Sequence, residues 1–168
     1  MKTRNIMVTI FSTTALFLAS CAPATDPANT SSFLNEVAEG GMAEVQLASL
    51  ALTRTQNPEV KEFAKRMIDD HTKATDELKP IAASKSITLP KEPGATEKSL
   101  SDKLSKLSGA EFDKEYVKAM VEDHEKDVKA FQTQAQNGTD TDVRAFAAKT
   151  LPTLQEHLQM IQNIKAKM

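Results

Sequence analysis

The three histidines of this chain end similar sequence segments, each with an acidic residue directly before the histidine. Met-Ile-Asp-Asp-His ends at His71, Met-Val-Glu-Asp-His ends at His124, and Thr-Leu-Gln-Glu-His ends at His157. In each case an apolar residue lies three positions before the histidine, and another lies seven positions after it. On a helix these positions share one face, so the repeat predicts three imidazoles on the buried faces of three helices.

A fourth segment contains no histidine but offers a carboxylate on the same kind of face. Glu44 shares a helical face with small and apolar residues three, four and seven positions away. It lies 13 residues before the first predicted turn and His71 lies 14 residues after it, so an antiparallel hairpin places both at the same height. His124 and His157 are less evenly placed about the second turn, with a predicted mismatch of about 6 Å that a distortion at Pro152 would have to correct.

Three neutral imidazole nitrogens and one carboxylate form a donor set that suits zinc, copper or iron. The sequence therefore predicts a mononuclear metal site in the helical core, with one ion of zinc, copper or iron as the expected cofactor. The predicted ligands are Glu44, His71, His124 and His157. The acids directly before the histidines are predicted to hold the remaining ring nitrogens: Asp70, Asp123 and Glu156.

The same histidines also fit a purely structural interpretation. Hydrogen bonds to Glu44, to the hydroxyls of Thr75 and Thr153, or to water would form a buried polar network that fixes the register of the helices. In either interpretation Glu44 needs a proton, an imidazolium or a metal ion, because an isolated charge in an apolar core is very costly. Four methionines are interpreted as core residues rather than copper ligands: Met42, Met67, Met120 and Met160.

Composition and pattern predict helices throughout and no strands. The chain has five glycines and no tryptophan, and it is rich in alanine, leucine, glutamate, lysine and glutamine. Capping and turn residues indicate long helices at 32–56, 57–84, 109–136 and from about 141 to the C-terminus, with a minor helix at 96–107. These elements predict an all-α, up-down-up-down four-helix bundle with a long, partly helical crossing between helices two and three.

The N-terminal segment predicts export and a lipid anchor. Lys2 and Arg4 precede an apolar stretch over residues 6–19 that is too short to span a bilayer. The following Leu-Ala-Ser-Cys resembles the lipobox of bacterial lipoproteins, and Cys21 is the only cysteine of the chain. Cys21 is therefore expected to carry a covalent lipid that holds the protein on a membrane. Ala22 after the cysteine favours the outer membrane, with the domain facing the periplasm.

These features divide the chain into a lipoprotein signal peptide (1–20), a lipidated cysteine with a flexible tether (21–32), and a four-helix bundle domain (33–168). Loss of the signal leaves 19 basic against 23 acidic residues without any basic stripe, so nucleic acid is not an expected partner. The sequence contains no phosphate-binding loop and no nucleophile elbow. The membrane is the predicted partner, and the sequence indicates no protein partner. No catalytic motif is recognised, so an enzyme that uses the metal is only a third interpretation, behind a metal-binding protein and a structural one.

Several motifs spread over residues 33–165 occur together. They are Glu-Val-Gln-Leu from Glu44, the Asp-His pairs at His71 and His124, Leu-Ser-Gly-Ala-Glu-Phe from Leu107, and Leu-Pro ahead of His157. In these motifs the chain resembles a family of exported bacterial proteins catalogued as domain of unknown function 4142. The resemblance implies a ferritin-like four-helix bundle in the cell envelope, and no established reaction comes with it.

In one respect the chain departs from ferritin-like di-iron proteins. Those proteins place a glutamate three residues before each metal histidine, where this chain has Ile68, Val121 and Leu154. Too few inward carboxylates are therefore predicted for a di-iron centre, and ferroxidase or oxygenase activity is not expected. The sequence thus predicts an envelope lipoprotein of unestablished activity, with either a mononuclear metal site or a structural histidine and glutamate network in its core.

Overall fold

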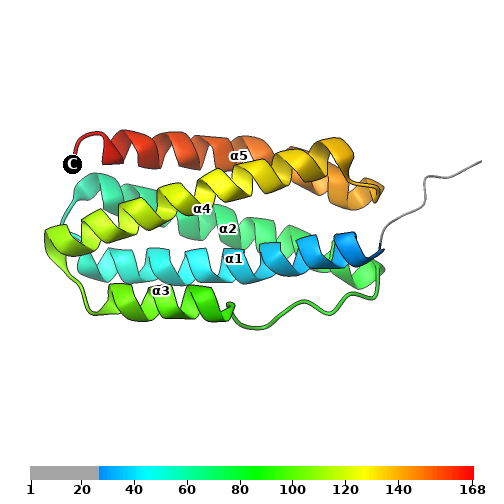
Figure 1. Cartoon of the computed structure of the whole chain (residues 1–168), viewed down its shortest axis with the longest axis horizontal. Coiled ribbons are helices and arrows are strands. Elements are labelled where there is room, and N and C mark those ends of the chain that lie inside the picture. The colour runs from blue at the N-terminus through cyan, green and yellow to red at the C-terminus, as the bar shows by residue number, and fades with distance from the viewer. Residues whose placement is uncertain (1–26) are drawn as a thin grey trace, which may run out of the picture.

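The computed structural model describes residues 27–168, which fold into five helices and no strand (Figure 1). The helices are α1 (Pro27–Arg54), α2 (Pro58–Ser84), α3 (Ala95–Ser105), α4 (Gly109–Asn137) and α5 (Thr141–Lys165). The all-α class and the bundle of four long helices are therefore confirmed. The predicted signal peptide, Cys21 and residues 22–26 lie outside the described residues. Among the helices of residues 27–168, none is both long and apolar enough to cross a membrane.

Two antiparallel helix pairs form the bundle. α1 packs mainly on α2, and α4 packs mainly on α5, because short turns join the members of each pair. Contacts of α2 with α5 and of α1 with α4 hold the two pairs together, so the four long helices enclose one core. The short helix α3 lies on the outside of this arrangement and contacts α1 and α4 (Figure 1).

The direction of the helices differs from the predicted up-down-up-down order. Lys85 after α2 is ion-paired with Asp140 before α5, and Lys167 after α5 is ion-paired with Glu59 at the start of α2. α2 and α5 are therefore antiparallel, which makes α2 and α4 parallel and the order up-down-down-up (Figure 1). The loop over residues 85–94 and the 11-residue α3 are together long enough to return along the whole bundle, rather than only across its end.

Capping residues fix where the helices begin, as the sequence indicates. The Asn57 side chain accepts hydrogen bonds from the backbone amides of Glu59 and Val60 at 2.9 and 3.4 Å, and Pro58 is the first residue of α2. Asp140 caps α5 in the same way, with donors at 3.0 and 3.1 Å. Because these side chains satisfy amides that have no partner within the helix, they set the register of both hairpins.

α1 begins at Pro27, five residues before the predicted start, so the assignment of residues 27–32 to a flexible tether is wrong. Proline fits the first turn of a helix because the amide that it lacks would have no helical partner there. Thr30 is buried, and Phe33 packs edge to face on Phe131 of α4 with ring centroids 5.2 Å apart. These contacts hold the first turns of α1 on the bundle.

Two hydrophobic clusters fill the core and leave a polar layer between them. One cluster contains Phe63 and Tyr116, and the other contains Phe33 and Phe131. In every long helix one buried polar residue falls between the segments that enter the two clusters: Glu44, His71, His124 and His157. Apolar packing on both sides therefore fixes the height of this layer in the bundle.

Candidate metal centre

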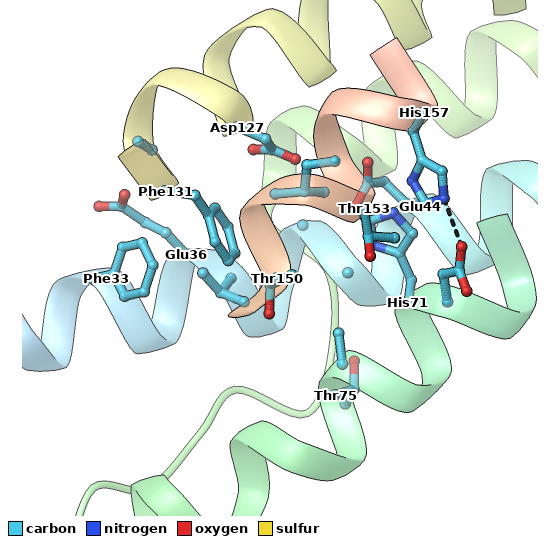
Figure 2. A pocket seen from close by; sticks show the side chains of 17 residues that line it. Phe33, Glu36, Glu44, His71, Thr75, Asp127, Phe131, Thr150, Thr153 and His157 are labelled. Carbon is cyan, nitrogen blue, oxygen red and sulfur yellow. Dashed lines mark hydrogen bonds and ion pairs between the residues drawn. The ribbon is translucent and has the colours of Figure 1, made fainter. Parts of the chain in front are cut away.

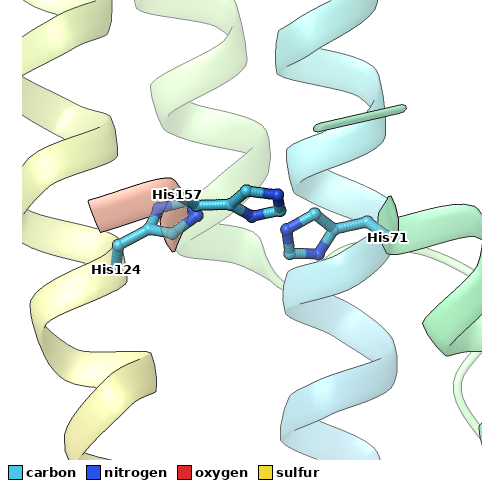
Figure 3. A group of neighbouring side chains, drawn as sticks. All are labelled: His71, His124 and His157. Atoms are coloured by element: carbon cyan, nitrogen blue, oxygen red, sulfur yellow. The ribbon is translucent and has the colours of Figure 1, made fainter. Parts of the chain in front are cut away.

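The three histidines meet in the polar layer, one each from α2, α4 and α5 (Figure 3). The ring centroids of His71 and His124 are 6.0 Å apart, those of His71 and His157 are 5.4 Å apart, and those of His124 and His157 are 5.5 Å apart. One nitrogen of each ring lies within 4.8 Å of a nitrogen of the other two. The mismatch predicted between His124 and His157 is therefore absent, although α5 continues without interruption through Pro152.

Each imidazole uses one ring nitrogen in a polar contact and leaves the other without a partner. His124 Nδ1 donates to the backbone carbonyl four residues earlier at 2.9 Å, and His157 Nε2 donates to Asp70 at 2.8 Å. His71 Nδ1 lies 2.8 Å from Glu44 Oε2. The nitrogens without a hydrogen-bond partner are His71 Nε2, His124 Nε2 and His157 Nδ1, and all three are buried.

Metal-binding histidines have this arrangement, since one nitrogen donates its proton to a carbonyl or carboxylate and the other presents a lone pair to the ion. A backbone carbonyl only accepts hydrogen bonds, so the proton of neutral His124 is on Nδ1 and its lone pair is on Nε2. The Asp70 carboxylate fixes His157 in the same way, with the lone pair on Nδ1. Metal–nitrogen bonds of about 2.0–2.1 Å place two nitrogens on a tetrahedral ion about 3.4 Å apart, so rings whose nitrogens lie within 4.8 Å of one another would have to close further around an ion.

Burial keeps the three histidines neutral. None is more than 7% exposed, and removal from water lowers the pKa of each imidazole from 6.5 to about 4. A neutral imidazole is the form that binds a metal, so an ion displaces no proton from these rings at pH 7. Phe63 closes one side of the group, with its ring centroid 6.0 Å from that of His124 and 6.2 Å from that of His157.

Glu44 adjoins two of the three histidines. Its Oε2 lies 2.8 Å from His71 Nδ1, which confirms the predicted equal height, and its Oε1 lies 3.7 Å from His124 Nε2. Two donors on one tetrahedral ion are about 3.4 Å apart, so Glu44 Oε1 and His124 Nε2 are placed to share an ion. Burial raises the pKa of Glu44 from 4.5 to about 8, and a bound cation would oppose that shift.

Asp70 and Glu156 differ in their contacts, although each directly precedes a histidine. Partial burial opposes ionisation of Asp70, but hydrogen bonds from His157 and Arg66 outweigh it and lower the pKa of this carboxyl. Glu156 is exposed and is ion-paired with Arg66. Asp70 therefore holds a histidine as predicted, whereas no contact joins Glu156 to a histidine within residues 27–168.

Two acids of α4, Asp123 and Asp127, lie beside Glu44, and no hydrogen bond joins either of them to a histidine within residues 27–168. Burial lowers the pKa of His71, and Asp123 acts on this imidazole only through its charge, which opposes that shift. Oxygens of these three carboxyl groups lie within 4.8 Å of one another. Burial and the charge of Glu44 raise the pKa of Asp127 to about 9, and burial also raises the pKa of Asp123. Asp127 is absent from the predicted site, although its position four residues after Asp123 places both on one helical face.

Three of the four methionines follow the interpretation as core residues, whereas Met42 is half-buried and belongs to neither core cluster. Met67 and Met120 are fully buried in the cluster that contains Phe63. Met160 packs partly buried against that cluster, and its sulfur lies 3.5 Å from a nitrogen of Arg66. These positions account for the three methionines by packing and by a contact with a cation, without a metal.

A cavity of about 80 Å³ reaches the polar layer from the surface (Figure 2). Side chains from α1, α2, α4 and α5 turn into it, and Glu44, His71, Asp127 and His157 lie along its wall (Figure 2). Gly41 on α1 also lines the cavity, where a Cβ atom would lie 3.3 Å from the hydroxyl oxygen of Thr75. The cavity is large enough for water and therefore offers an ion a route to the histidines.

Residues 17–164 match the family described as domain of unknown function (DUF4142). The chain belongs to this family. The matched region contains every residue of the predicted metal site, and it confirms the family that the sequence motifs indicated. DUF4142 has no function in its description, so the match assigns no activity. No curated protein matches the chain.

Solved structures with a similar fold share little sequence with this DUF4142 protein. A DUF305 fragment from Deinococcus radiodurans has a TM-score of 0.73 and 15% identity, covering 87% of this chain and 99% of that one. A putative secreted DUF305 protein from Streptomyces coelicolor has a TM-score of 0.71 and 16% identity, covering 86% and 94%. CopM in a Cu(I)-bound form has a TM-score of 0.68 and 16% identity, covering 82% and 95%, and its silver-bound and Cu(II)-bound forms also match. At these identities the likeness shows the helical bundle alone.

Proposed function

We propose that this DUF4142 protein binds one copper ion through His71, His124 and His157, with Glu44 as a fourth ligand. One observation supports this most directly: three buried ring nitrogens, one from each histidine, lack a hydrogen-bond partner while the rings face one another. A buried polar atom without a partner destabilises a fold. A single cation could satisfy all three nitrogens at once, whereas a purely structural network would have to satisfy them with water.

Copper is proposed ahead of zinc and iron on two grounds. Divalent copper binds a given set of nitrogen and oxygen ligands more tightly than divalent zinc or iron does. CopM, whose solved structures contain Cu(I) or Cu(II), shares the helical bundle, and this adds support. Zinc and iron remain the ions against which copper has to be compared in any binding experiment.

Binding rather than catalysis is the role that we infer for the site. The histidines are almost fully buried and Phe63 covers one side, so protein surrounds the ion except toward the narrow cavity. The N-terminal sequence supports a lipid on Cys21, which would hold this domain on the outer membrane within the periplasm. The proposed protein is therefore a membrane-anchored copper-binding lipoprotein of the cell envelope.

The full chain, purified in mild detergent, is expected to bind one equivalent of Cu(I) in competition with a chelator of known affinity. Asp70→Asn is expected to lower that affinity about 10- to 100-fold, because it weakens the hydrogen bond that orients His157. Asp69→Asn is the matched control, since it removes the same charge from an exposed side chain one residue earlier. Its affinity should equal that of the wild type.

A folded wild-type chain that takes up neither copper, zinc nor iron would rule out the metal site. Equal copper affinities for Asp69→Asn and Asp70→Asn would contradict the role of the Asp70 carboxylate in orienting His157 for the metal. Circular dichroism of each variant, recorded without metal, separates a loss of binding from a loss of folding.

The lipid anchor makes a separate prediction. Cys21→Ser is expected to move the protein from the membrane fraction to the soluble fraction, because serine cannot form the thioether that carries the lipid. Ser20→Ala keeps a small residue before the cysteine and should leave the protein in the membrane fraction. Immunoblots of fractionated cells measure the distribution, and a Cys21→Ser protein that stays with the membrane would contradict an anchor at this residue.

A further inference from the structure

Three carboxyl groups form a group of their own beside the histidines. Oxygens of Glu44, Asp123 and Asp127 lie within 4.8 Å of one another, with Glu44 on α1 and the two aspartates one turn apart on α4. Negative charges at such distances repel one another strongly unless a cation or a proton lies between them. The group therefore requires compensation from its surroundings.

No lysine or arginine among the described residues provides that compensation, and the two histidines beside Glu44 are neutral at pH 7. Within residues 27–168, no lysine or arginine forms an ion pair with Glu44, Asp123 or Asp127. The exposed side chain of Lys126 makes no ion pair with the two aspartates, and its charge only opposes the rise in their pKa values. Asp140 shows the contrast, because Lys85 lies 2.8 Å from its carboxylate.

Glu44 gives a second indication of a missing ligand. It is only 1% exposed, and its Oε1 has no hydrogen-bond partner. A carboxyl oxygen left unpaired in a dry core is costly. The groups beside Glu44 on α4 are His124, whose Nε2 lies 3.7 Å from Oε1, and the two acids, so the Glu44 carboxylate is placed to bridge the copper ion and a second cation. The cavity that contacts both Glu44 and Asp127 supplies a route for an ion and space for water (Figure 2).

We propose that Glu44, Asp123 and Asp127 bind a second cation, a hard divalent ion of the class of Mn²⁺, Mg²⁺ and Ca²⁺. Such ions prefer carboxylate oxygens and water, whereas imidazole nitrogens favour copper and zinc. Carboxylates from two helices supply the protein ligands, and water in the cavity completes the coordination. The polar layer of the bundle thus contains two neighbouring sites of different chemistry.

This inference goes beyond the copper site and rests on it only through Glu44, which lies at the boundary of both sites. Glu44 Oε2 contacts His71 and Oε1 lies 3.7 Å from His124 Nε2, while the carboxyl group also adjoins the two aspartates. Asp123 and Asp127 belong to the second site alone, and His157 belongs to the first site alone. The two proposals can therefore fail separately.

Mn²⁺ binding to the full chain in detergent tests the second site. The chain is first saturated with Cu(I), which has no unpaired electrons, so the electron paramagnetic resonance signal of free Mn²⁺ reports how much Mn²⁺ is bound. One equivalent is expected to bind. Asp127→Asn is expected to weaken Mn²⁺ binding by about tenfold or more without changing the Cu(I) affinity. Asp123→Asn is the second variant, with the same expected loss.

Glu125→Gln is the matched control, because it removes one exposed negative charge from the same helix and should leave Mn²⁺ binding unchanged. His157→Ala should lose Cu(I) binding and retain Mn²⁺ binding. A folded wild-type chain that binds no Mn²⁺, or Mn²⁺ binding that neither aspartate variant weakens, would overturn the second site. Mn²⁺ binding by a chain that binds no Cu(I) would overturn the copper site alone.

Discussion

Replacing His124 with leucine is expected to abolish tight copper binding and to stabilise the ion-free protein. The His124 ring is fully buried, and its Nε2 has no hydrogen-bond partner. Leucine brings no polar side-chain atom into the core, so the variant removes a penalty of about 1–3 kcal/mol for an unsatisfied buried group. The carbonyl that accepts from Nδ1 keeps its helical hydrogen bond within α4.

The structural interpretation of the histidines predicts the opposite result. If His124 only belonged to a network that fixes helix register, its removal would break that network and destabilise the ion-free fold. The copper-bound states differ as well. At a copper concentration about 100 times the dissociation constant, the wild type gains about 2.7 kcal/mol, and a variant that cannot bind copper gains nothing.

Thermal unfolding followed by circular dichroism, with copper and with a chelator, measures both effects. In a domain of this size 1 kcal/mol shifts the midpoint by about 2–4 °C, so the expected differences are measurable. His71→Leu is the comparator, because it also removes a ligand but leaves Glu44 Oε2 without its contact, and it should destabilise the ion-free protein. An equal destabilisation by His124→Leu would favour the structural network over the metal site.

The helical pattern was sufficient to place the histidines because each is bracketed by apolar residues on its own helix. Met67 and Leu78, for example, enter opposite core clusters on either side of His71. The capped turn at Asn57 then fixes the height of Glu44 relative to His71, because the two residues lie almost equally far from this turn along their helices. Local signals therefore determine those parts of the site that lie within one hairpin.

The features that the sequence did not reveal depend on contacts between hairpins. Nothing local indicates whether the loop over residues 85–94 crosses the end of the bundle or returns along it, and that path decides the direction of α4. Asp127 resembles a solvated surface acid until α1 and α4 pack together and bring it to Glu44. Residues 27–32 have the composition of a tether, and they belong to the helix because α1 is held on α4 through Phe33.

The inward carboxylates are also more numerous than the sequence predicted. Asp123 and Asp127 join Glu44 in the polar layer. The two aspartates lie one turn apart on α4, and neither lies three positions before a histidine. They therefore do not form the glutamate and histidine pairs of a di-iron centre. The three carboxyl groups instead make the stability of the ion-free protein depend strongly on pH.

The ion-free protein is expected to lose stability as the pH rises from 7 to 9. Burial raises the pKa of Glu44 to about 8 and that of Asp127 to about 9, whereas both would ionise near pH 4 in the unfolded chain. The folded state therefore retains protons that the unfolded state has released, and this stabilisation disappears as the pH passes the folded values. Each retained proton gives a slope of about 1.4 kcal/mol per pH unit.

The histidines do not contribute in this range, because a pKa of about 4 in the fold leaves them neutral in both states above pH 7. Glu44→Gln should therefore flatten the dependence of the unfolding free energy on pH, measured by urea titrations from pH 7 to 9, while Asp69→Asn should leave the slope unchanged. Saturating metal should reverse the trend, because the cation takes the place of the protons and binds better as they leave. A pH-independent unfolding free energy in the ion-free wild type would show that the carboxyl group of Glu44 is already compensated by the protein itself.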